Sequence, residues 1–115
     1  MHEAALAIEV LQLLERQAPS LSRITRVEID VGALSCVDAD ALRTALLAAL
    51  HGTLADSCDL VLTPRPAQAQ CLACGAHYSP PDRIEPCPQC GSARKQWLAG
   101  EALTLRRIEG IPTQP

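Results

Sequence analysis

The sequence predicts an α+β fold in which two helices pack on a three-stranded mixed sheet, with a small four-cysteine module inserted into that sheet. Apolar residues recur at helical spacing in 4–17 and 38–50. Residues 24–31 alternate between apolar and polar side chains, and two Cys-x-x-Cys pairs lie within 67–99. The 115 residues have room for one domain, or for a small domain with an appended module.

The first helix is expected over residues 4–17. Its apolar side chains fall on one face because they are spaced three or four positions apart. They are Leu6, Val10, Leu13 and Leu14. Pro19 is expected to stop the helix, since proline cannot continue the hydrogen-bonding pattern.

A strand, a second helix and a second strand are expected to follow. Residues 24–31 place valine and isoleucine on one side and charged residues on the other, and a strand at 59–63 closes at Pro64-Arg65-Pro66. Asp38 is the expected N-cap of the second helix, and Gly52 is expected to end it. Because this order favours a right-handed crossover, the two strands should pair in parallel if they are neighbours.

The last strand is expected over residues 102–108, where the chain returns to the sheet. The tail after Gly110 is expected to be loose, as chain ends often are. This arrangement divides the chain into an α/β domain, made of residues 1–66 plus 100–115, and a module at 67–99.

The cysteine spacing identifies the chemistry of the inserted module. Cys71-Leu-Ala-Cys74 and Cys87-Pro-Gln-Cys90 match a tetrahedral zinc site. A glycine follows each pair and allows a turn through positive φ that points backbone N–H groups at sulfur. Four thiolates leave no open coordination position, so such a zinc-ribbon-like site is structural rather than catalytic. Disulfides, or unrelated thiol pairs, are the alternative.

Composition excludes several classes of function. The net charge is −3, and Trp97 and Tyr78 are the only aromatic residues, which argues against a nucleic-acid surface. No export signal or membrane-spanning run is recognisable, and zinc-type thiols suit a reducing compartment, so we expect a cytoplasmic protein. Without a catalytic triad context, a phosphate loop or an open-position zinc motif, an enzyme is not expected.

The segment Met1-His2-Glu3 has two interpretations. It can be a frayed terminus, which is the usual state of such residues. Alternatively, the adjoining helix holds it in place, and the bulky His2 favours retention of Met1. The Met1 amine and the backbone nitrogen and imidazole of His2 could then chelate one ion, with the backbone nitrogen of Glu3 completing a square. Such a nitrogen-rich, near-planar set suits Ni(II) or Cu(II) better than zinc.

Other candidate residues have simpler explanations. His77 is expected to be a surface histidine because four cysteines already saturate one ion, although a role in metal handling stays open. Cys36 and Cys58 are expected to be small buried hydrophobes, with metal binding or a redox pair as the alternative. His51 is expected to complement the dipole of the second helix, and Trp97 to pack over the zinc module.

Four segments taken together resemble the HypA family, the nickel metallochaperones of [NiFe]-hydrogenase maturation, some of which also serve urease. The segments are Met1-His2-Glu3, Gly32-Ala33-Leu34-Ser35-Cys36-Val37-Asp38, Gly52-Thr53-Leu54-Ala55 and the two cysteine pairs with Gly91. They occur in the family's order, and the resemblance covers nearly the whole chain.

The resemblance implies a role for each matching residue. His2 matches the family's nickel ligand, with the Met1 amine and the backbone nitrogens of His2 and Glu3 as co-ligands and the Glu3 side chain tuning the site. Asp38 matches an acidic position near the nickel, although its capping role explains it equally well. The implied zinc ligands are Cys71, Cys74, Cys87 and Cys90. In some relatives histidines adjoin the thiol pairs and modulate the zinc site. Here neither pair is directly followed by a histidine and only His77 lies near one, so the resemblance does not extend to that feature.

The resemblance also implies partners. These are a nickel-storing GTPase and the hydrogenase large-subunit precursor, with urease maturation proteins as further candidates. Neither nucleic acid nor a membrane is an expected partner. Monomer and homodimer both stay open, as does the choice between hydrogenase and urease. The alternative function is a zinc-ribbon module that docks onto protein or nucleic acid without transferring nickel.

Overall fold

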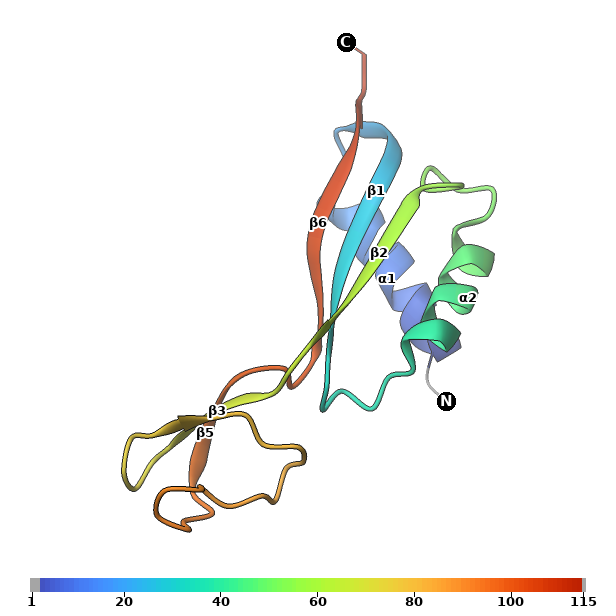
Figure 1. Ribbon diagram of the computed structural model, residues 1–115. Coiled ribbons are helices and arrows are strands. Elements are labelled where there is room, and N and C mark those ends of the chain that lie inside the picture. The colour runs from blue at the N-terminus through green and yellow to red at the C-terminus, as the bar shows by residue number, and fades with distance from the viewer. Residues whose placement is uncertain (1–2, 115) are drawn as a thin grey trace.

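Two three-stranded sheets organise residues 3–114, the part of the chain that this computed structural model describes (Figure 1). The elements are α1 (Glu3–Gln17), β1 (Leu21–Gly32), α2 (Ala39–Leu50), β2 (Asp59–Arg65), β3 (Gln68–Cys71), β4 (His77–Tyr78), β5 (Lys95–Ala99) and β6 (Leu103–Pro112). The molecule is elongated, with principal extents of 58 × 31 × 18 Å. No helix within these residues is long and apolar enough to cross a membrane.

The first sheet has the strand order β2-β1-β6, and α1 and α2 cover one of its faces (Figure 1). β1 pairs in parallel with β2 and antiparallel with β6. The predicted mixed sheet, with two helices packed on it, is therefore confirmed. The parallel pairing follows because α2 connects the two strands as a crossover.

The fully buried side chains of the core between this sheet and the helices are aliphatic. The largest that are fully buried are Leu14, Ile24, Val27, Ile29, Leu42 and Leu46. They lie on one face of each element, as the spacing of apolar residues predicts. The core therefore sits between the helices and the sheet, and the opposite face of β1 carries Arg26, Glu28 and Asp30 in ion pairs.

The ends of α2 form as predicted. The Oδ1 atom of Asp38 accepts hydrogen bonds from the N–H groups of Asp40 at 3.0 Å and Ala41 at 3.3 Å, which makes Asp38 the N-cap. Gly52 follows the helix with a φ of +77°, a value that suits glycine. Asp38 therefore fixes where the loop before α2 joins the helix, and Gly52 marks where the helix has ended.

The strands of the first sheet are longer than the sequence predicts, and β1 begins at Leu21 rather than at residue 24. β2 continues through Pro64 to Arg65, because β2 is an edge strand and Pro64 can lack a donor on its free side. The expectation of a loose tail after Gly110 is wrong as far as Thr113. β6 runs to Pro112, which pairs with Leu21, and the Thr113 N–H donates to the Ser20 carbonyl at 2.7 Å.

The second sheet has the order β4-β3-β5 and lies entirely within residues 68–99. Two connecting segments, one between β2 and β3 and one between β5 and β6, join this sheet to the first sheet. Their backbones pack closely at Gly100. This glycine has a φ of +82°, and a Cβ atom there would collide with the Pro66 carbonyl and with the backbone of Ala67. The domain boundaries at 66/67 and 99/100 stay a prediction.

Candidate metal centre

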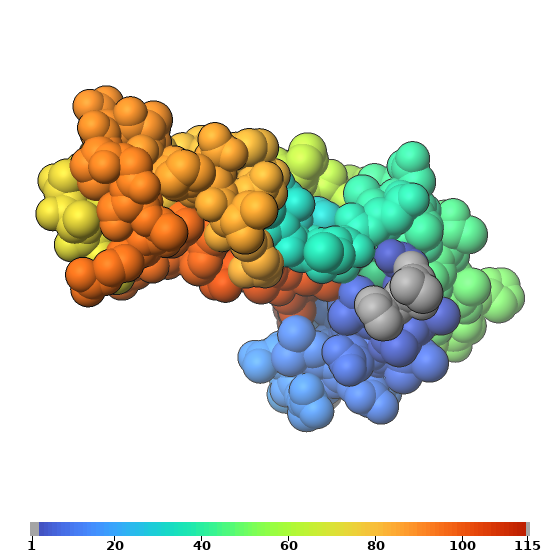
Figure 2. All heavy atoms as spheres, turned by 90° about the horizontal axis from the view of Figure 1, so that it is seen from below, coloured from blue at the N-terminus to red at the C-terminus, as the bar shows by residue number. Residues whose placement is uncertain are grey.

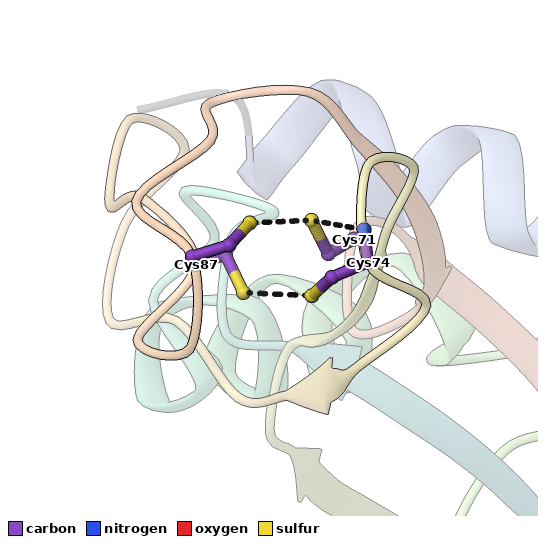
Figure 3. Close-up of side chains that lie close together, drawn as sticks. Cys71, Cys74 and Cys87 are labelled. Carbon is purple, nitrogen blue, oxygen red and sulfur yellow. Dashed lines mark hydrogen bonds between the residues drawn. The ribbon is translucent and has the colours of Figure 1, made fainter.

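Four cysteine sulfurs converge at the end of the second sheet. The sulfur atoms of Cys71, Cys74, Cys87 and Cys90 all lie within 4.8 Å of one another. Figure 3 shows Cys71 and Cys74 facing Cys87, with their sulfurs turned toward a common centre. Two side chains, Cys71 and Cys87, are buried, and the other two are exposed.

The sulfur separations fit one tetrahedral ion. Cys71 Sγ lies 3.5 Å from Cys90 Sγ, and Cys74 Sγ lies 3.7 Å from Cys87 Sγ. A tetrahedral ion with metal–sulfur bonds of about 2.3 Å separates its sulfurs by about 3.8 Å. All six cysteines of the chain are free thiols, so the disulfide alternative is wrong. The cluster can therefore hold a single tetrahedral metal ion with no ligand position left over.

Each cysteine pair forms a similar turn. The Gly75 N–H donates to the Cys71 carbonyl at 2.9 Å, and the Gly91 N–H donates to the Cys87 carbonyl at 2.8 Å. The two glycines have φ values of +80° and +78°, so the predicted positive-φ turns are confirmed.

Backbone N–H groups inside these turns point at sulfur. Ala73 N lies 3.4 Å and Cys74 N lies 3.5 Å from Cys71 Sγ, and Gln89 N lies 3.4 Å from Cys87 Sγ. These donors stabilise a thiolate, which is the form that ligates metal. The turn chemistry therefore prepares the sulfurs for a cation.

The thiols differ in how readily they lose a proton. The hydrogen bond from the Cys74 N–H outweighs burial and, with that from Ala73, lowers the pKa of Cys71 to about 6. At Cys90 the Ser92 N–H acts in the same direction, but the hydrogen bond with Cys71 and burial raise the pKa to about 12. A bound cation removes this conflict by neutralising the accumulated negative charge.

Of the predicted nickel residues the structure describes Glu3, which lies in the α/β domain and not in the cysteine module. Met1 and His2 fall outside the described residues. Glu3 begins α1, is only 8% exposed, and its Oε2 atom accepts a hydrogen bond from the Asp38 N–H at 3.3 Å. Asp38, which the family resemblance puts near this site, contacts Glu3 through its backbone N–H while its side chain caps α2.

Other candidates occupy simpler positions. His77 is exposed on β4 and does not belong to the four-sulfur cluster. His51 is the C-cap residue of α2, with Nδ1 at 3.8 Å from Asp56 Oδ1. The prediction that Cys36 is buried is wrong, because it is exposed in the loop before α2 with a φ of +61°. Cys58 is half-buried, and burial raises the pKa of its thiol.

Sequence reasoning missed Arg83. This exposed arginine lies in the loop between β4 and β5 and donates hydrogen bonds to Leu34 and Glu101 of the α/β domain. Trp97 lies on β5, within the module and half-buried, with Arg83 and Lys95 each 5.8 Å from its ring centre, and its role as an apolar cover stays a prediction. A single arginine in a loop gives no periodic signal, so only the tertiary contacts could find it.

Comparison with known proteins agrees with this geometry. The family described as "Hydrogenase/urease nickel incorporation, metallochaperone, hypA" matches residues 1–110. The hydrogenase maturation factor HypA of Acidithiobacillus ferrooxidans is 40% identical over 111 residues, covering 95% of this chain and 98% of the relative. The hydrogenase maturation factor HybF of Escherichia coli O157:H7 is 35% identical over the same length, with the same coverage.

Solved structures show the same fold. The solution structure of the nickel metallochaperone HypA from Helicobacter pylori aligns with a TM-score of 0.76 at 20% identity, covering 98% of this chain and 100% of that one. A second HypA solution structure aligns with a TM-score of 0.72 at 21% identity, covering 96% and 97%. With the family match spanning residues 1–110 and relatives similar over almost their full length, the chain belongs to the HypA family of nickel metallochaperones.

Proposed function

We propose that this protein binds Ni(II) at its N-terminus and delivers it to a hydrogenase large-subunit precursor with the help of a nickel-storing GTPase. The observation that carries the proposal is the match of residues 1–110 to a nickel-incorporation family. The match includes the α/β domain as well as the cysteine module. It therefore disfavours the alternative of a zinc-ribbon interaction module without nickel transfer.

The proposed nickel ligands are the imidazole of His2, the Met1 amine and the backbone nitrogens of His2 and Glu3. Nitrogen ligands in a near-planar set suit Ni(II). The Glu3 carboxylate, held by the Asp38 N–H, adds negative charge beside this set. Because amine and amide protons must leave before nickel binds, affinity should fall as the pH is lowered. The mechanism is binding and transfer of the cargo ion, with no catalytic step.

The proposed role of the four cysteines is to hold one structural Zn(II). The sulfur separations of 3.5 and 3.7 Å agree with tetrahedral thiolate coordination. Cys71, Cys74, Cys87 and Cys90 would then be the zinc ligands. Bound zinc supplies a cross-link between the two turns and leaves no position for a reacting molecule.

The remaining proposals concern location and assembly. The proposed site of delivery, to a maturing hydrogenase or to urease maturation proteins, is the cytoplasm, where thiol ligands stay reduced. It acts as a monomer or a homodimer, and neither nucleic acid nor a membrane is a partner.

Nickel titration tests the proposed site. Calorimetry with Ni(II) on the wild type should show one site per chain, and His2→Ala and a variant with one additional N-terminal residue should each lose it. His77→Ala is the matched control, because it removes an exposed histidine of β4, in the cysteine module, and should bind like wild type. Nickel affinity unchanged in both N-terminal variants would overturn the proposal. Metal analysis should find one zinc per chain throughout.

A further inference from the structure

Arg83 joins the cysteine module to the α/β domain. It lies in the proline loop, defined as residues 79–86, between β4 and β5. Its Nη2 donates to the Leu34 carbonyl and its Nη1 to Glu101 Oε2, both at 3.2 Å. Its guanidinium also lies 5.8 Å from the ring centre of Trp97. Among the described residues, no other side chain of 67–99 makes a hydrogen bond to the α/β domain.

The loop that Arg83 contacts, residues 33–38, also contacts Glu3. Leu34 lies in the loop 33–38, where it is 9% exposed and its N–H donates to the Gly100 carbonyl at 2.9 Å. The same loop ends at Asp38, whose N–H donates to Glu3 Oε2 at 3.3 Å.

Side-chain bonds stiffen this loop between its two contacts. The Ser35 hydroxyl donates to the Gly32 carbonyl at 2.7 Å and accepts from the Val37 N–H at 3.4 Å. Figure 2 shows the teal spheres of loop 33–38 between the light-orange proline loop and the blue spheres of α1. A displacement at Leu34 would therefore reach Asp38 through a short, hydrogen-bonded segment.

We infer that Arg83 is a positioning residue for nickel binding: it clamps the cysteine module against loop 33–38 and so holds the Glu3 carboxylate in place. This inference rests on the proposed N-terminal nickel site. Arg83 does not touch the metal in this role. It acts through Leu34 and Asp38, which set the position of Glu3.

The residue type suits the task. Arginine presents several donors in a rigid planar fork, so one side chain can serve a carbonyl and a carboxylate while its face lies near an aromatic ring. Lysine carries the same charge at a single point and cannot keep that geometry. Arg83 and Glu101 are about half exposed, so each contact alone is weak, and the effect depends on all three acting together.

Three variants of the full-length zinc-loaded protein test the clamp. Arg83→Ala removes all three contacts, Arg83→Lys retains the charge, and Arg94→Ala is the control. Arg94 is an exposed basic residue of the same module, and its hydrogen bonds in the structure come from its backbone. The measurements are amide hydrogen exchange at Asp38, Ni(II) titration, and the visible absorption band of bound Ni(II). Trp97, the only tryptophan, reports the loss of Arg83 through its fluorescence.

Arg83→Ala should speed exchange of the Asp38 amide and weaken Ni(II) binding, each by about three- to tenfold, as expected for losing a few weak polar contacts. It should also shift the nickel absorption band and the Trp97 emission. Arg83→Lys should recover part of the nickel affinity, and Arg94→Ala should match wild type. Zinc content should stay at one ion per chain in every variant.

Two results would overturn the inference. One is unchanged Asp38 exchange in Arg83→Ala, whether or not nickel binds at His2. The other is nickel affinity that His2→Ala abolishes but Arg83→Ala leaves intact. Failure of the proposed nickel site is a separate observation, since it would appear as unchanged affinity in His2→Ala itself.

Discussion

The α/β domain and the cysteine module differ in what stabilises each of them. The domain buries a continuous set of aliphatic side chains between two helices and a sheet. The described module residues that are buried are few and mostly small, namely Ala67, Ala69, Cys71, Pro80 and Cys87. In such a segment, apolar burial alone does not offset the conformational entropy that the chain loses on folding. The segment therefore needs a cross-link. Packing therefore stabilises the α/β domain, whereas the module depends on a cross-link, the role proposed for zinc at the four cysteines.

Removing the metal should give the largest effect. We expect a strong chelator, or Cys71→Ser together with Cys87→Ser, to unfold residues 67–99 while the α/β domain stays folded. Structural zinc in small modules is worth about 10–16 kcal/mol, far more than the module's small core can replace. Two-dimensional NMR should show loss of dispersion in the module resonances only. Cooperative loss of the whole spectrum would show that the two regions do not fold independently.

Truncating the domain core should have the next largest effect. Leu46→Ala removes a side chain that is 0% exposed and should lower the free energy of unfolding by about 2–5 kcal/mol. Leu72→Ala is the matched change in the module, where the leucine is 53% exposed, and should stay within about 0.5 kcal/mol. Urea denaturation of the zinc-loaded protein measures both. Equal losses would contradict the division between packing and metal.

The joint between the regions should respond to a single methyl group. In Gly100→Ala the new Cβ would meet the Pro66 carbonyl and Ala67 backbone, and alanine would also adopt a φ of +82°. In Gly52→Ala the φ is similar, at +77°, but nothing lies within 4 Å of the new atom. We expect about 1–2 kcal/mol for Gly52→Ala from backbone strain and a larger loss for Gly100→Ala. Thermal unfolding monitored by circular dichroism compares the two, and equal shifts would show that the joint tolerates the methyl group.

Acid should act weakly on the domain through Asp56. The Gly52 N–H donates to Asp56 Oδ2 at 3.1 Å, and this bond is the largest cause of a lowered pKa, with His51 and Ser57 adding to it. Since the folded pKa lies below the ordinary 3.8, the stabilisation is complete above 3.8 and disappears as the pH falls through the folded value. In Asp56→Asn the unfolding midpoint should depend less on pH in that acidic window. An identical pH profile for the variant and wild type would contradict this assignment.

Local patterns were enough to predict most elements. The helix periodicity of α1, the alternation of β1 and the capping of α2 by Asp38 depend on neighbours close in sequence, so they could be read directly. The four-sulfur cluster was also readable, because each Cys-x-x-Cys turn forms within a few residues. Cys36 was mispredicted because burial depends on what packs over a loop, and residue type alone does not reveal that.

By itself, the sequence determined the two helices, the parallel strand–helix–strand unit and the two Cys-x-x-Cys turns, each of which brings two thiols together. Short-range sterics and periodicity govern these features. Only the tertiary structure decided that the tail continues β6 beside Leu21, and that Arg83 reaches Leu34 from 49 positions away. Those contacts join residues that share no local pattern. Their geometry follows from how the sheet and the module are placed, and the free energy of the whole fold sets that placement.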